Sequence, residues 1–599
     1  MHMTLKNVFG FDSLRPAQSA PIQAVLQGRN VFCVMPTGGG KSLIYQLPAL
    51  LRPGLAIVIS PLIALMADQV QALKLLGIEA AALNSNIETD EQARIWRGIR
   101  SGQTKLLYLS PERLMSGDMI KTLRSLPLSL IAIDEAHCIS QWGPSFRPEY
   151  EKLSGLGQAF PGIPVVALTA SADEITRTDI VEKLFGGKAD VFVSGFDRPN
   201  LSLLVTPKQG WKQQLSDFVR GHKGESGIVY CLSRKKCEQA AALLRSYGHK
   251  CLVYHAGMDR EERADNQKTF VREPGMIMAA TIAFGMGIDK PDVRFVFHTD
   301  LPASIEAYYQ EFGRAGRDGD PAECAMLYGA GDIALRRQFI ENDGGDDSTR
   351  RRAHKRLDAL IGYCESPTCR RQTLLAYFGE ASEPCGNCDV CLNPVPLKDG
   401  VREGQMVLSA MLRTGERFGP AHIVDIIRGA DTAKIRQFGH EHLPTWGVGK
   451  HLKKTEWLSI IRQMVAAGFI KSDVAGYGGL SMQAKGRLLL KGLAEFSYRP
   501  LVKPKRTRQH IGEAGKVNLP KQSVLEPAAA RLFGRLKDKR LELAKAQGVA
   551  AFMIFHDKTL REMARKFPQS LDEMANIHGI GAAKLEKFGP AFLEICRKT

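Results

Sequence analysis

The chain has 599 residues, 44% of them hydrophobic and 24% charged, and a formal net charge of +18. This length exceeds what one hydrophobic core supports, so we expect about three to five domains. No apolar run approaches the roughly 18 residues that cross a bilayer. The N-terminus lacks the basic start and following apolar run of a secretory signal, so none is expected. The sequence therefore predicts a cytoplasmic protein without membrane spans. An excess of positive charge this large favours nucleic acid as partner over a surface that is basic only for solubility.

Short apolar runs alternate with amphipathic stretches along the first part of the chain. Such runs suit parallel strands that are buried on both faces. The pattern restarts near residue 226, which predicts an α/β multidomain protein with two doubly wound parallel sheets, joined near residues 197–206. After residue 335 we expect the strands to stop, apart from a later hairpin. The runs are residues 55–60, 105–110, 130–134 and 165–169, then 227–231, 251–255, 276–280 and 294–298.

A glycine-rich segment, Met-Pro-Thr-Gly-Gly-Gly-Lys-Ser, occupies residues 35–42. Gly38, Gly39 and Gly40 let backbone N–H groups approach a triphosphate, Lys41 answers its terminal phosphates, and Ser42 can ligate magnesium. Met35 stands where the simple pattern of this loop has its first glycine. The segment alone is a weak signal, because glycine-rich turns are common.

An apolar run that ends in two carboxylates, Asp134 and Glu135, follows about ninety residues later. Asp134 would hold the magnesium ion together with Ser42, and Glu135 would polarise the attacking water. Both this pair and the glycine segment fall at strand ends, where catalytic residues of doubly wound sheets lie. The combination predicts hydrolysis of a nucleoside triphosphate.

Two arginines in the second sheet domain, Arg314 and Arg317, are spaced one helical turn apart. Guanidinium groups at this spacing share a face and suit the charge that develops on a γ-phosphate. If they reach the site from the other domain, hydrolysis requires closure of the cleft, so that chemistry drives domain motion. This predicts a motor, whereas a solvated basic helix is the simpler alternative.

Four cysteines, Cys369, Cys385, Cys388 and Cys391, crowd into a short segment. Two consecutive C-x-x-C steps let sulfurs face one ion, and four thiolates complete a tetrahedron, so the spacing predicts a structural zinc site. A disulfide pair and an iron–sulfur cluster are the alternatives. Cys364 is the odd one out and is expected to be a packed or free thiol.

The remaining segments are helical or basic. A basic helical stretch precedes the cysteines, and residues 403–495 read as short helices with a Gly-rich hairpin at 473–480. Residues 485–508 carry eight Lys or Arg against one Glu and look like an extended tether. A compact helical piece is expected from 525 to 599.

Ordered motifs along nearly the whole chain resemble those of the superfamily 2 helicases, and most closely the RecQ family of DNA helicases, bacterial type. The resemblance implies two RecA-like domains, a zinc-binding helical subdomain, a winged helix and a small all-α helicase-and-RNaseD C-terminal (HRDC) domain. The motifs that carry it are residues 11–18 (Phe-Asp-Ser-Leu-Arg-Pro-Ala-Gln), 60–70, 108–114, 134–142, 167–173, 196–200, 254–258, 281–290 and 310–319.

The resemblance also implies nucleotide contacts. Arg15, Thr37 and Asp289 would bind ATP, and Gln18 would read adenine. Its amide can accept from adenine N6–H₂ and donate to N7, a match that guanine lacks. Thr169 and Ser171, at a strand end, are hydroxyls placed to relay between nucleotide and nucleic acid or to cap the next helix.

The resemblance assigns DNA contacts to an aromatic-rich loop after the catalytic acids. Trp142, Phe146 and Arg147 would contact single-stranded DNA and signal to the ATP site, since aromatic rings stack on bases. Pro144 and Ser145 stand where the family commonly has His-Asp, which puts the strength of this coupling in question. Tyr477 in the hairpin either wedges between base pairs or is an exposed loop tyrosine.

The predicted domains are residues 1–200 and 201–335 (RecA-like), 336–400 (zinc-binding), 401–498 (winged helix), 499–524 (basic linker) and 525–599 (HRDC). We expect an ATP-dependent 3′–5′ DNA helicase of recombination, repair and replication-fork maintenance that uses ATP, Mg²⁺ and Zn²⁺. The expected partners are single-stranded and tailed duplex DNA and, through the family, single-stranded DNA-binding protein. A monomer associated with the nucleoid is expected. The rival interpretations are an RNA helicase and a DNA-annealing protein that uses ATP as a switch; the HRDC domain would bind single strands or a partner protein.

Overall fold

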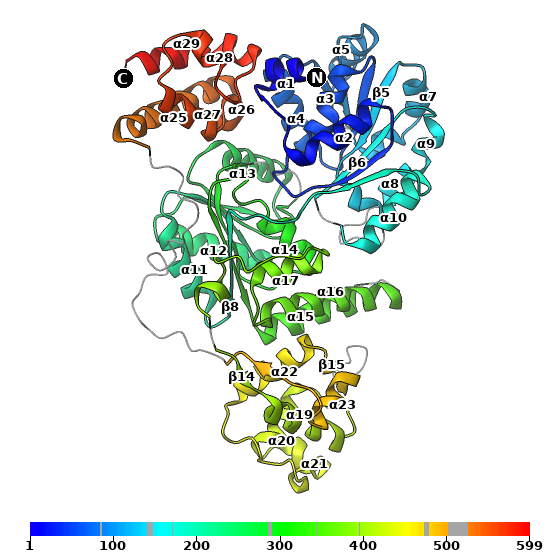
Figure 1. Cartoon of the computed structure of the whole chain (residues 1–599), viewed down its shortest axis with the longest axis vertical. Helices are drawn as coiled ribbons and strands as arrows, with labels where there is room; N and C mark the ends of the chain where they lie inside the picture. The colour runs from blue at the N-terminus through cyan, green and yellow to red at the C-terminus, as the bar shows by residue number, and fades with distance from the viewer. Residues whose placement is uncertain are drawn as a thin grey trace.

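The computed structural model describes residues 1–83, 87–140, 148–170, 172–285, 290–343, 346–394, 396–472, 479–500 and 525–598. Among these residues no helix is long and apolar enough to cross a membrane. Two α/β domains form the upper and middle parts of the molecule, a helical domain lies below them, and the C-terminal helices lie beside the N-terminal domain (Figure 1).

The first domain is built on a seven-stranded sheet of order β3-β4-β2-β5-β6-β1-β7, in which all neighbours are parallel. Its central strands are buried along their whole length because helices cover both faces. The strands are β1 (Val31–Val34), β2 (Leu55–Ile59), β3 (Ala80–Leu83), β4 (Leu106–Leu109), β5 (Leu128–Ile133), β6 (Val165–Thr169) and β7 (Asp190–Val193), and the helices α1 (His2–Phe9), α2 (Pro16–Leu26), α3 (Leu43–Leu51), α4 (Ile63–Leu75), α5 (Thr89–Arg100), α6 (Pro111–Leu114), α7 (Met119–Arg124), α8 (Pro148–Glu151), α9 (Leu156–Ala159) and α10 (Glu174–Phe185).

The second domain repeats this plan with a six-stranded parallel sheet of order β10-β11-β9-β12-β13-β8. The two parallel sheets confirm the predicted α/β class. The elements are β8 (Leu201–Pro207), β9 (Ser226–Tyr230), β10 (Cys251–Tyr254), β11 (Ile277–Ala280), β12 (Val293–His298) and β13 (Ala322–Tyr328), with α11 (Trp211–Val219), α12 (Arg234–Ser246), α13 (Arg260–Arg272) and α14 (Ile305–Phe312).

Helices dominate after the second sheet, as expected. The sequence predicted one later hairpin, but the structure also has a second pair of short strands. Two short antiparallel strand pairs occur among the residues that the structure describes, β14 with β17 and β15 with β16. The first pair was missed because two-residue strands carry no periodic signal. The elements are α15 (Ala330–Asn342), α16 (Asp347–Glu365), α17 (Arg370–Tyr377), α18 (Asp389–Leu392), β14 (Lys398–Asp399), α19 (Val401–Arg413), α20 (Pro420–Arg428), α21 (Ala433–Phe438), α22 (Lys454–Ala466), β15 (Ile470–Ser472), β16 (Leu480–Met482), α23 (Ala484–Leu490) and β17 (Ser497–Tyr498).

The C-terminal domain is a small helical bundle with its own apolar core, centred on Leu532, Leu560 and Phe592. This core also takes in Leu75 at the end of α4 in the first domain. The bundle is therefore docked on the rest of the chain. Its helices are α25 (Pro527–Gln547), α26 (Ala551–Ile554), α27 (Asp557–Lys566), α28 (Leu571–Ala575) and α29 (Ala582–Arg597).

Candidate active site and metal site

The glycine-rich segment forms the loop between β1 and the N-terminus of α3, where backbone N–H groups favour an anion. Gly38 and Gly40 have φ values of 77° and 81°, a left-handed conformation that disfavours side chains. The Lys41 ammonium lies inside the loop and donates to the Met35 carbonyl at 3.2 Å. Burial lowers the pKa of Lys41, while the charges of Glu135 and Asp134 act against this shift. A phosphate entering the loop would supply the anion that this lysine faces.

The two carboxylates stand at the end of β5. Glu135 has φ 52° and ψ 44°, which is strained for a residue with a Cβ and is typical of functional positions. Burial, with the charge of Glu135, raises the pKa of Asp134 to about 7. Burial also opposes ionisation of Glu135, but the hydrogen bond and charge of His137 and the charge of Lys41 lower its pKa to about 2. Glu135 is thus held ionised, which its expected role of polarising water would require.

His137 connects the acids to the neighbouring strand. Its Nδ1 lies 3.3 Å from a Glu135 carboxylate oxygen and 2.9 Å from the Thr169 hydroxyl at the end of β6. Both His137 and Thr169 are buried. Thr169 therefore contacts the catalytic segment directly, which favours the relay interpretation over a helix cap.

The arginine segment of the second domain faces the phosphate loop of the first. A Cβ added to Gly38 would stand 3.4 Å from the Arg317 Cα, and the Thr37 hydroxyl donates to the Gly313 carbonyl at 2.8 Å. Arg317 adds to the lowering of the Lys41 pKa, and Arg314 to that of Glu135. The structure thus brings both predicted arginines to the same cavity as Lys41 and Glu135.

Arg198, in the segment between the domains, was not singled out from the sequence as a site residue. Its guanidinium donates to the Thr37 carbonyl at 2.8 Å and to the carbonyls of Gly313, Ala315 and Gly316 at 3.2, 2.8 and 2.8 Å. The side chain therefore joins the phosphate loop to the arginine segment. A lone arginine in a linker gives no local signal of this role, because its acceptors are more than a hundred residues away.

Arg15 and Gln18, which are expected to contact the nucleotide, lie at the N-terminus of α2. The Gln18 amide donates to the Gly40 carbonyl at 3.0 Å and accepts from the Arg15 N–H at 3.0 Å, and the Arg15 guanidinium donates to the Gly38 carbonyl at 2.6 Å. Both side chains thus lie against the phosphate loop, and adenine would have to displace the Gln18 contacts. One cavity of about 650 Å³ runs from Phe11 and Arg15 past Lys41 and the acids to Arg317.

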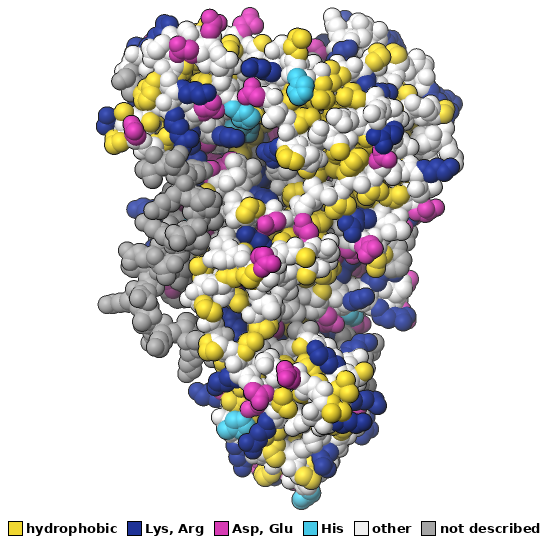
Figure 2. Space-filling model, viewed as in Figure 1, with side chains coloured by type: hydrophobic (Ala, Val, Ile, Leu, Met, Phe, Trp, Pro, Cys, Tyr) yellow, Lys and Arg dark blue, Asp and Glu magenta, His cyan; other side chains and the backbone are white. Residues whose placement is uncertain are grey.

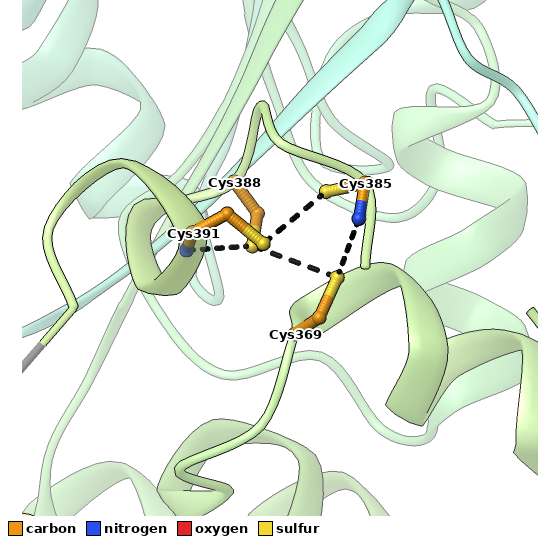
Figure 3. A group of neighbouring side chains, drawn as sticks. All are labelled: Cys369, Cys385, Cys388 and Cys391. Atoms are coloured by element: carbon orange, nitrogen blue, oxygen red, sulfur yellow. Dashed lines mark hydrogen bonds between the residues drawn. The ribbon is translucent and has the colours of Figure 1, made fainter. Parts of the chain in front are cut away.

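The four cysteines converge on one point (Figure 3). The Cys385 and Cys391 sulfurs are 4.0 Å apart, and those of Cys388 and Cys369 are 3.9 Å apart. A tetrahedral site with zinc–sulfur bonds of 2.3 Å requires sulfur separations of roughly 3.8 Å, so the group fits zinc. The Cys385 thiol and the N–H groups of Cys391 and Arg370 lower the pKa of Cys388 to about 4. Cys364 is buried outside this group and is a free thiol.

Residues next to the four cysteines are hydrogen-bonded to the segment between the two sheet domains. Arg371 donates to the carbonyls of Arg198 and Leu201 at 3.1 and 2.5 Å, and the Asn387 amide donates to the Pro199 carbonyl at 3.2 Å. Arg371 and Asn387 each lie within two residues of a zinc ligand. The zinc-binding segment therefore orders the linker that carries Arg198.

Six predicted site residues lie outside the described residues, so their contacts are not described; one of them is Ser171, the second of the two proposed relay hydroxyls. The other five are Trp142, Phe146 and Arg147 of the aromatic-rich loop, Asp289, and Tyr477 of the hairpin.

Comparison with known proteins places this geometry in a family. The matching family models are DEAD/DEAH box helicase (residues 15–178), helicase conserved C-terminal domain (211–319), RecQ zinc-binding (330–392), RQC domain (394–507) and HRDC domain (529–596). A Pasteurella multocida protein, ATP-dependent DNA helicase RecQ, is 42% identical over 597 residues, which cover 99% of this chain and 93% of that protein. The chain belongs to the RecQ family. The Bacillus subtilis RecQ helicase is 37% identical over 593 residues, 98% of this chain and 97% of its own.

Family membership settles the general activity. The chain is an ATP-dependent DNA helicase, with two RecA-like domains, a zinc-binding domain, an RQC winged helix and an HRDC domain. The four-cysteine group lies in the segment that matches the RecQ zinc-binding model.

Proposed function

We propose that this helicase unwinds duplex DNA by translocating 3′ to 5′ along one strand, in recombination, repair and replication-fork maintenance. The proposal that the protein is a motor rests mainly on one cavity, which is lined by Lys41 and the two acids of one RecA-like domain and by Arg314 and Arg317 of the other. Groups split between two domains act together only when the cleft is closed, so each hydrolysis cycle moves one domain against the other. The 3′–5′ direction rests on the family resemblance.

In this proposal each site residue has one role. Lys41 binds the terminal phosphates, Ser42 and Asp134 hold Mg²⁺, and Glu135 polarises the attacking water. Arg314 and Arg317 stabilise the charge that develops on the transferred phosphoryl group. Oxygen donors suit magnesium, and Ser42 and Asp134 line the same cavity, which supports this pairing. Arg15, Gln18, Thr37 and Asp289 complete nucleotide binding.

DNA occupancy is proposed to reach the ATP site through the loop that holds Trp142, Phe146 and Arg147. This loop directly follows the segment in which His137 touches both Glu135 and Thr169. A strand bound to the loop would shift His137 and with it the catalytic carboxylate. Stimulation of hydrolysis by DNA, rather than affinity, is the proposed role of these residues.

The winged-helix domain is the proposed duplex contact. Figure 2 shows Lys and Arg side chains along both flanks of the lowest part of the molecule, where this domain lies. Positive charge on this surface suits phosphate contacts, with Tyr477 as a strand-separating candidate. We further propose a monomer that acts in the cytoplasm at the nucleoid and that meets single-stranded DNA-binding protein on exposed single strands.

A strand-displacement assay tests the proposal. Duplexes with a 3′ tail, a 5′ tail or an RNA composition are offered with and without ATP, and Lys41→Ala serves as the inactive control. We expect unwinding only of 3′-tailed DNA with ATP. Equal unwinding of 5′-tailed substrates would refute the polarity, preference for RNA would favour an RNA helicase, and ATP binding without unwinding would favour an annealing protein.

A further inference from the structure

The HRDC domain is docked against the segment that leads into the base end of the ATP site. The Gly579 N–H donates to the Gly10 carbonyl at 2.7 Å, and the rings of His578 and Phe11 stack with centroids 5.1 Å apart. Backbones meet here without side chains between them, since a Cβ added to Gly581 would stand 2.3 Å from the Val8 carbonyl oxygen. The contact lies only a few residues before Arg15 and Gln18.

The same domain is also docked on the second RecA-like domain. The Arg561 guanidinium binds both Asp320 carboxylate oxygens, at 3.1 and 2.9 Å, three residues after Arg317. The Arg272 guanidinium donates to the Gly548 carbonyl, and the Lys545 ammonium lies 3.6 Å from a Glu273 carboxylate oxygen. The HRDC domain therefore bridges the base-end segment of one domain and the arginine segment of the other.

This bridge lies along the nucleotide cavity itself. His556, Lys558, Thr559, His578 and Gly579 of the HRDC domain line the cavity that holds Lys41, Glu135 and Arg317. Lys558 and His556 are exposed, so their side chains face the space that nucleotide would cross. The apolar part of the contact is small, chiefly Leu75 and Val271, which suits an interface that separates during turnover.

We propose that the HRDC domain is a third wall of the ATP site, and that nucleotide enters and leaves only while this domain is detached. His578 covers one face of Phe11, and Lys558 contributes a cation at the cavity rim. Docking fixes both sides of the cleft at once, so the docked state is closed around nucleotide. Release of ADP then waits for the HRDC domain to separate from both RecA-like domains.

A glycine pair in the HRDC domain gives a matched test. Gly581 has φ −89° and ψ 165°, which alanine adopts freely, and in Gly581→Ala the three atoms nearest the added methyl, within 3.0 Å, all belong to Asn7 and Val8 of the first RecA-like domain. Gly534→Ala in α25 is the control, because its Cβ would meet nothing within 4 Å. Release of a fluorescent ADP analogue from the full-length zinc-loaded protein is followed by stopped flow. We expect Gly581→Ala to speed release about ten-fold, equivalent to roughly 1.4 kcal/mol of docking free energy, and Gly534→Ala to match the wild type.

A covalent tether tests whether a permanently docked HRDC domain slows the release of ADP. Glu273→Cys with Lys545→Cys places two thiols across the interface for a short bismaleimide, and the unreacted double variant is the control. We expect the linked protein to release ADP at least about ten-fold more slowly than the unreacted one. The yield of linking also reports docking, and Gly581→Ala should lower it. Wild-type release from the linked protein would overturn the proposal, as would wild-type release from Gly581→Ala with a lowered linking yield.

Discussion

Arg198→Ala should slow ATP hydrolysis by loosening the closed cleft. Of the four main-chain acceptors that the guanidinium contacts, Thr37 belongs to the phosphate loop and the other three belong to the arginine segment. The guanidinium bridges the two segments, so breaking the bridge costs at least the Thr37 bond, and a hydrogen bond from a charged donor contributes roughly 1.5–3 kcal/mol. At about 1.4 kcal/mol per factor of ten, the closed state loses roughly ten- to a hundred-fold in population.

DNA-stimulated ATPase measured against ATP concentration tests this reasoning. We expect the loss in kcat, with a smaller change in KM, because the chemistry rather than nucleotide capture needs both domains. Arg198→Lys keeps the charge but not the forked geometry of the guanidinium, so its kcat should lie between those of Arg198→Ala and the wild type. Circular dichroism and the melting temperature control for folding. A kcat for Arg198→Ala within two-fold of the wild type, with intact fold, would refute the role of the bridge.

Four further predictions concern other parts of the chain. Lys41→Ala should lower ATPase and unwinding below about a tenth of wild type, because the lysine is proposed to bind the terminal phosphates of ATP. DNA binding measured by anisotropy should persist. Cys388→Ala should remove the zinc found by metal analysis and with it a large share of roughly 10 kcal/mol of coupled folding; a zinc-free native protein that is active would contradict the site. Phe146→Ala should keep basal ATPase and DNA affinity within about three-fold but largely lose stimulation by single-stranded DNA, and full stimulation would make the loop a binding surface only. Burial lowers the pKa of His222, but the hydrogen bonds and charges of Glu225 and Glu323 outweigh burial and raise this pKa to about 9. The protonated imidazole therefore stabilises the fold fully below about pH 6.5, and this contribution is lost as the pH rises to about 9. Over this pH range the melting temperature should fall less in His222→Gln than in the wild type.

The sequence predicted the two sheets because their central strands are apolar throughout. Runs such as residues 165–169 coincide with β6, and the others agree with β2, β4, β5 and β9 to β12 within about two residues. Other strands were not singled out. β3 (Ala80–Leu83) is mostly alanine, and β7 (Asp190–Val193) lies at the sheet edge with alternate residues exposed, so neither reads as a continuous apolar run.

Residues of the candidate ATP site could be proposed from the sequence where the chemistry fixes a local pattern. Lys41, Glu135 and Arg317 follow from spacing and side-chain type, and the structure brings them to one cavity. Arg198 and the HRDC contacts with the cavity were not predictable in the same way. They depend on which distant segments meet, and neither a single arginine nor a histidine after an isoleucine has a pattern that encodes its partner.

Because the zinc-binding segment is hydrogen-bonded to the linker between the two sheet domains, loss of zinc should affect ATP hydrolysis at a distance. Arg371 and Asn387 fix residues 198–201 through main-chain carbonyls, and Arg198 in turn joins the two halves of the ATP site. A chelated protein should therefore resemble Arg198→Ala in its ATPase before the RecA-like sheets themselves melt. Loss of the structural ion and loss of the Arg198 guanidinium would then disturb the same contact between the two domains.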